Sequence, residues 1–122
     1  MNINELAAAA HLNAVSKGFY ENPPSIETRL LLIHSEVSEA CEAHRIGKMP
    51  TSDPNFILGF SEPNFLESFP LHIKNTLWDE IADVVIRCCD FAASEGVDLE
   101  AHIIAKMRYN ATRPHKHGGK AY

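Results

Sequence analysis

The chain has 122 residues, a length that suits one domain with a core of its own. Apolar residues make up 45% of the chain, as in an ordinary globular protein, and no apolar run approaches the roughly 20 residues that span a bilayer. The net charge of -5 argues against broad electrostatic binding to nucleic acid. We therefore expect neither a membrane partner nor a stable nucleic-acid complex.

The N-terminus has no basic segment followed by an apolar one, so we expect no secretory signal and a cytoplasmic protein. The three cysteines, Cys41, Cys88 and Cys89, all fall within apolar helical patterns, and no pair has the spacing of a metal knuckle. Buried, reduced thiols are therefore expected, which agrees with that compartment.

A first helix is predicted over residues 3–20, where alanines allow close contact between helices. Gly18 weakens its end, and the Pro23-Pro24 pair stops it. Lys17 lies in the last turn. A solvated lysine that compensates the helix dipole is the simpler interpretation, and a ligand-binding lysine is the alternative.

The second helix is predicted over residues 26–46, with Ser25 as N-cap and Gly47 as the stop. It has a broad apolar stripe, yet it also carries Glu36 and Glu39. At 3.6 residues per turn these two glutamates lie about 60° apart on one face. A pair of carboxylates in an otherwise apolar helix indicates a function beyond solubility.

Residues 48–74 differ in composition from the helices. They hold four of the seven prolines (Pro50, Pro54, Pro63, Pro70) and four of the six phenylalanines (Phe56, Phe60, Phe65, Phe69). Proline excludes a long helix, and so many aromatic residues argue against a disordered linker. We expect a long ordered loop with a short helical turn near Phe65, which acts as a lid or as an interface.

A third helix is predicted over residues 76–95, and Thr76 with Asp79 resembles a capping box. Its apolar pattern is again interrupted by two carboxylates three residues apart, Glu80 and Asp83. Arg87 follows on the same side, where an internal salt bridge is the favoured role.

Asp98 is expected to cap a fourth helix over residues 99–112, which ends before Pro114. Lys106, Asn110 and Arg113 nominally share one side of it. Four such helices without strand signals predict an all-α fold, an antiparallel bundle of about four main helices with a long ordered loop insertion at 48–74.

The two acidic pairs predict a bound cation. Four carboxylates packed together would repel one another and lose hydration unless a cation compensates them. A site whose ligands are all carboxylate oxygens, with no histidine or cysteine, suits Mg²⁺, and Mn²⁺ is the alternative. The cationic residues of the last helix would then contact phosphate oxygens, so the combination indicates metal-assisted phosphate chemistry. The simpler alternative is ordinary surface charge.

The same residues resemble the MazG-like branch of the all-α nucleoside triphosphate pyrophosphohydrolases. The resemblance is carried by residues 30–45 (LLLIHSEVSEACEAHR), 76–91 (TLWDEIADVVIRCCDF) and 106–114 with the His117-Gly-Gly-Lys120 segment. The family has a Glu-x-x-Glu pair and a Glu-x-x-Asp pair that together bind Mg²⁺. In this chain those metal ligands would be Glu36, Glu39, Glu80 and Asp83. More residues separate Glu39 from Glu80 than usually separate the two pairs in this family, and the excess is the 48–74 insertion.

The resemblance implies a single domain over residues 1–122 that hydrolyses a nucleoside triphosphate between its α and β phosphates. Glu39, or less favourably Glu36, would orient or deprotonate the attacking water. The phosphate-contacting residues would be Lys106, Asn110, Arg113 and Lys17. The family also implies a homodimer or homotetramer.

The sequence raises three alternatives, of which the last two remain open. A di-iron oxidase would need Glu-x-x-His pairs, which this chain lacks. A non-catalytic helical module that binds nucleotide or a protein would keep the fold without turnover. A phosphoribosyl-ATP pyrophosphohydrolase would use the same machinery on another substrate.

Overall fold

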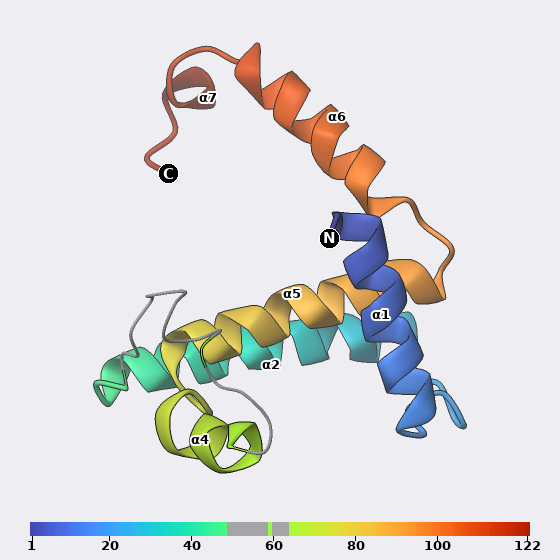
Figure 1. Cartoon of the computed structure of the whole chain (residues 1–122). Helices are drawn as coiled ribbons and strands as arrows, with labels where there is room; N and C mark the ends of the chain where they lie inside the picture. Colours follow the sequence, from blue (N-terminus) through green and yellow to red (C-terminus); the bar gives the residue numbers. More distant parts are fainter. Residues whose placement is uncertain (49–58, 60–63) are drawn as a thin grey trace. The chain divides into compact units, whose positions relative to one another are not determined.

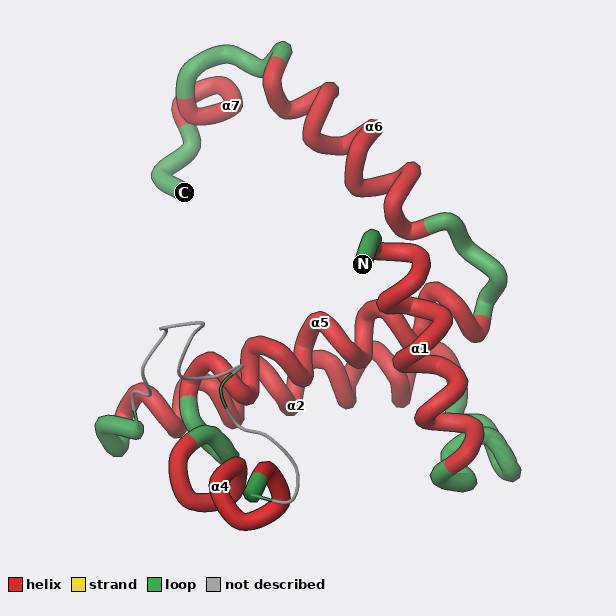
Figure 2. The backbone as a smooth tube through the Cα atoms, in the orientation of Figure 1, coloured by secondary structure: helices red, strands yellow, loops and turns green. Residues whose placement is uncertain are grey.

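The structure is a computed structural model that describes residues 1–48, 59 and 64–122. These residues form six helices and no strand (Figures 1 and 2). The helices are α1 (Ile3–Ser16), α2 (Ile26–Arg45), α4 (Phe65–His72), α5 (Leu77–Ser94), α6 (Leu99–Ala111) and α7 (Lys116–Gly119). The predicted all-α class is thus confirmed. None of these helices is both long and apolar enough to cross a membrane.

The chain divides into two units. The central unit comprises residues 20–88, and the terminal unit comprises residues 1–19 together with 89–122. Helix α5 belongs to both, because the boundary falls near its middle. The prediction of one domain over residues 1–122 stays a prediction.

In the central unit, α2 and the first part of α5 lie side by side (Figure 1). Ser25 begins α2 as predicted, because its hydroxyl accepts the Thr28 backbone N–H at 3.2 Å. The buried residues of α2 are Glu36, Ala40 and Ala43, which recur at the spacing of one helix face. Glu36 contacts α5, so this is the face that α2 turns toward α5, and its two alanines permit a close approach.

The insertion between these helices begins and ends at one place. The Leu77 backbone N–H donates to the Lys48 carbonyl at 3.1 Å, which ties the start of α5 to the end of α2. Of the predicted 48–74 loop, residues 49–58 and 60–63 lie outside the described part, and with them Phe56 and Phe60. The helical turn expected near Phe65 is present as α4, in which the Phe65 and Phe69 rings lie 5.5 Å apart.

The start of α5 differs from the predicted capping box. The Thr76 hydroxyl donates to the Ile73 carbonyl at 2.5 Å, and Asp79 Oδ2 accepts the Asn75 backbone N–H at 2.8 Å. Asn75 has a left-handed backbone (φ 61°), which aims its N–H at that carboxylate. The two residues therefore stabilise the turn before the helix instead of exchanging bonds with each other.

In the terminal unit, α1 contacts α6 near its N-terminus. The Asn4 side chain donates to Asp98 Oδ1 at 2.8 Å, and Asp98 also caps α6 by accepting the Ala101 N–H, as predicted. Helix α1 ends at Ser16, four residues earlier than predicted, because the chain turns at Gly18 with φ 86°.

The buried apolar side chains of the described residues are all small: Ala7, Ala40, Ala43, Cys89 and Ala92. The prediction of buried cysteines holds for Cys89 and partly for Cys88, but it is wrong for Cys41, which is exposed. Cys41 lies about 100° round α2 from Ala40, away from the buried face. The three thiols are free.

Candidate metal centre

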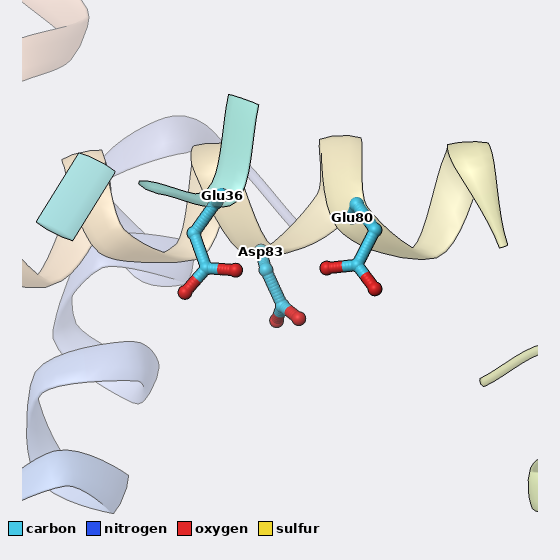
Figure 3. Close-up of side chains that lie close together, drawn as sticks. All are labelled: Glu36, Glu80 and Asp83. Carbon is cyan, nitrogen blue, oxygen red and sulfur yellow. The ribbon is translucent and has the colours of Figure 1, made fainter. Parts of the chain in front are cut away.

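Three carboxylates of the central unit meet where α2 and α5 pack together. Glu36, Glu80 and Asp83, which we call the acidic cluster, each offer one oxygen atom, and these atoms all lie within 4.8 Å of one another. Figure 3 shows the three carboxylates gathered in one place. Glu80 and Asp83 come from successive turns of α5, and Glu36 comes from α2, so the pairing of the two helices builds the cluster.

Burial distinguishes this cluster from ordinary surface charge. Glu36 and Glu80 are each only 7% exposed. The Glu36 carboxylate accepts a hydrogen bond from Arg87 Nε. Among the residues that the structure describes, no group donates a hydrogen bond to the Glu80 carboxylate or forms an ion pair with it. Burial without a hydrogen-bond donor disfavours the ionised form of a carboxylate, so a cation or a proton at Glu80 would be stabilising.

The two carboxylates of the cluster that come from α5 have raised pKa values. Burial, followed by repulsion from Glu39 and other carboxylates, raises the pKa of Glu80. Burial also raises the pKa of Asp83, and repulsion from Asp79 and Glu36 adds to it, while Arg87 acts in the opposite direction. The contribution of Asp79 was not anticipated from the sequence, since only its capping role was considered there.

Glu39 lies beside the acidic cluster but is not one of its three members. Its side chain is exposed, and its carboxyl group lies near that of Glu36. Interaction with the Glu36 carboxyl group, through a shared proton and through repulsion, raises the pKa of Glu39. One turn further along α2, Glu42 instead pairs with Arg45 at 2.7 Å, and the hydrogen bond from Arg45 lowers the pKa of Glu42. The glutamates of α2 therefore differ in environment despite their regular spacing.

The donor set of the acidic cluster fits a hard divalent cation. All three ligand groups are carboxylates, which suit Mg²⁺, Mn²⁺ or Ca²⁺ better than zinc. Oxygens on opposite sides of a Mg²⁺ ion are about 4.2 Å apart, twice the usual Mg–O distance. The three oxygens lie within 4.8 Å of one another, and ligands that are not opposite must lie closer than about 4.2 Å, so the side chains would have to move inward for one ion to contact all three.

The predicted phosphate-contacting residues of the last helix lie in the terminal unit. Lys106 Nζ lies 5.4 Å from the centre of the Tyr109 ring, and the Arg113 guanidinium lies 5.9 Å from it. Both cations therefore lie near the same ring, Lys106 within α6 and Arg113 just after its end. Lys17, the last of the predicted set, is exposed at the C-cap of α1.

Asn110 follows Tyr109 in the sequence and lies between Lys106 and Arg113 along the chain. Its Oδ1 atom is buried, and among residues 1–48, 59 and 64–122 it has no hydrogen-bond partner. Tyr109 was not singled out in the sequence, although an aromatic residue between two cations at helical spacing could have indicated it.

We compared the chain with protein-family models, with curated proteins and with solved structures, and nothing matched.

The geometry predicts how the metal-free protein responds to Glu80→Gln. The amide cannot ionise, so the variant should melt at a higher temperature than the wild type in EDTA at pH 7.

The raised pKa values of Glu80 and Asp83 mean that the folded wild type binds more protons than the unfolded chain. Its stability should therefore fall as pH rises above the ordinary carboxyl values of 4.5 and 3.8. Glu80→Gln should flatten that fall.

Thermal melts followed by circular dichroism between pH 4 and pH 8 would measure both effects. Glu42→Gln is the matched control, since Glu42 is paired and exposed, and it should give no gain in stability. A Glu80→Gln variant that melts below the wild type at pH 7 would mean that the Glu80 carboxylate is already compensated.

Proposed function

We propose that the protein is a Mg²⁺-dependent nucleoside triphosphate pyrophosphohydrolase of the MazG-like kind, which releases nucleoside monophosphate and pyrophosphate. Mn²⁺ would be an alternative cofactor. The observation that carries the proposal is the Glu80 carboxylate, 7% exposed, unpartnered among the described residues, and gathered with two further carboxylates. Such an arrangement is unfavourable without a cation, and a hard cation between carboxylates is the usual partner of phosphate groups.

In this proposal the side chains of α2 and α5 divide the work. Glu36, Glu80 and Asp83 hold the cation, with Glu39 as a further ligand or as the base. A bound Mg²⁺ would supply Lewis-acid polarisation of the phosphate oxygens. Glu39 is exposed to solvent and has a raised pKa, so its carboxylate is suited to accept a proton from the attacking water. Glu36 is less suited, because its carboxylate already accepts from Arg87.

The terminal unit would supply the contacts to the phosphate chain. Lys106 and Arg113 would neutralise its charge, with Lys17 as a further cation. The Asn110 side chain carries one acceptor and two donor positions, and its Oδ1 lacks a partner among the described residues. Oδ1 is an acceptor and cannot donate to a phosphate oxygen, so in this proposal the Asn110 Nδ2 amide would be the donor to phosphate.

We also propose that the chain assembles as a homodimer or homotetramer. Many large apolar side chains of the described residues are exposed, for example Leu31 at 68%, Ile104 at 59% and Met107 at 66%. Each large apolar side chain contributes roughly 1.5–3 kcal/mol when it is buried. Because the buried apolar side chains are alanines and a cysteine, a second copy is the natural source of further burial.

Activity tests the metal assignment directly. A screen of nucleoside triphosphates with Mg²⁺ should reveal pyrophosphate release by the wild type. Glu80→Gln and Asp83→Asn should each reduce kcat by about a hundredfold or more while the protein stays helical. The matched control is Glu42→Gln, which should retain activity. Wild-type turnover by the folded Glu80→Gln variant would contradict the proposal. Nucleotide binding without pyrophosphate release by the wild type would make the chain a binding module.

Lys106→Ala tests the phosphate contacts. The substitution should lower kcat/KM by about tenfold or more with the best nucleotide, because a cation that neutralises the phosphate chain is lost. Melting in EDTA should hardly change, since Lys106 is exposed. Lys74→Ala removes another exposed lysine and serves as the control. Equal kcat/KM for Lys106→Ala and the wild type would show an ordinary surface lysine.

Sedimentation velocity tests the assembly. At micromolar concentration the wild type should sediment at two or four times the chain mass of 13.6 kDa. Helix α6 has no buried residue, so the double substitution Ile104→Ser with Met107→Ser should spare the single chain and weaken association. The control replaces both residues with leucine and keeps the apolar surface. A monomeric wild type would contradict the assembly proposal.

A further inference from the structure

Arg87 stands out because it places a positive charge directly against the acidic cluster. It lies four residues after Asp83 and seven after Glu80 on α5, so it continues the same side of the helix. Its Nε donates to Glu36 Oε1, which links α5 to α2 through a charge-assisted hydrogen bond. The guanidinium is therefore the counter-ion of one buried carboxylate.

The two partners of this ion pair differ in burial. The Glu36 side chain is 9% exposed, whereas the Arg87 side chain is 41% exposed. The arginine can thus turn toward water more easily than the glutamate, which is packed between the helices. If a stronger cation binds the cluster, the arginine is the partner that can withdraw.

A divalent cation and the guanidinium compete for the same negative charge. Glu36 is one of the three residues whose oxygens lie within 4.8 Å of one another, and it is also the residue that Arg87 engages. Two positive ions on one carboxylate repel each other, and a partly buried site screens that repulsion less than water does. Arg87 should therefore oppose cation binding while it stabilises the metal-free protein.

We infer that Arg87 is the internal counter-ion of the acidic cluster, which holds Glu36 in the metal-free protein and is displaced when a divalent cation binds. The inference rests on the proposed metal centre and adds its regulation: the chain carries a built-in competitor that sets how much free cation the site requires. The cluster then never has to stand fully uncompensated. The consequence is an affinity for cation that is lower than three carboxylates alone would give.

The test is titration calorimetry with Mn²⁺ alone, and separately with Mg²⁺ alone, on protein that has been freed of metal. Arg87→Met removes the charge and keeps an unbranched side chain. It should bind the cation about fivefold more tightly, or better, than the wild type, since a like charge beside the site is gone. The metal-free variant should melt at a lower temperature, so the rise in melting temperature on adding metal should be larger than in the wild type.

Two further variants separate competition from other roles. Arg87→Lys keeps the charge but not the planar Nε donor, and its cation affinity should stay within about threefold of the wild type. Arg45→Met removes an arginine from a similar pair with Glu42, which is not part of the cluster, and should leave cation affinity unchanged. A structural role alone would lower the melting temperature of Arg87→Met without tightening cation binding.

The outcomes distinguish this inference from the proposed metal centre. If the wild type binds neither cation, the metal centre itself fails, and the inference with it. If the wild type binds and folded Arg87→Met binds equally or more weakly, Arg87 orients Glu36 and the competition is refuted while the metal centre stands. The Arg87 Nε–H resonance gives an independent readout in the wild type. It should move to the position and exchange rate of a free side chain at saturating Mg²⁺, and an unchanged signal would overturn the displacement.

Discussion

The burial of two carboxylates between α2 and α5 is the constraint on which the central unit depends. Glu36 and Glu80 lie on the packed faces of their helices, where hydrophobic residues would ordinarily stand. Ionised carboxylates at such positions oppose the pairing of the helices, because each loses hydration and repels the other. Arg87 offsets this cost at Glu36, and the raised pKa of Glu80 reflects the part that burial and repulsion leave.

The rest of the central unit is arranged to permit this pairing. Ala40 and Ala43 place only small side chains on the buried face of α2. Helix α5 can therefore approach closely enough for the carboxylates to meet. The hydrogen bond between Leu77 and Lys48 then joins the ends of the two helices across the insertion. Small buried residues limit the apolar contribution to stability, however, and leave large side chains exposed. That exposure is the ground for the proposed association with another copy.

Environment assigns different roles to carboxylates that look equivalent along the chain. Glu36, Glu39 and Glu42 recur every three residues on α2, yet one is buried beside an arginine, one is exposed beside Glu36, and one forms a surface ion pair. Their pKa shifts follow these surroundings: the pKa of Glu39 rises and that of Glu42 falls. In the proposed function these three glutamates become a ligand, a base and a surface residue.

The sequence by itself determined the helical class, most helix boundaries and which carboxylates to consider, because these follow from local periodicity and from caps such as Ser25 and Asp98. It also indicated that Glu36, Glu80 and Asp83 belong together. Only the tertiary structure decided that Arg87 pairs with Glu36 on the other helix, that Cys41 is exposed, and that Asn75 and Asp79 build the turn before α5. Each of these depends on which face of a helix meets its neighbour, or on a single left-handed residue. The physical reason is that burial and pairing are properties of contacts between distant segments, whereas periodicity records only what each segment could bury.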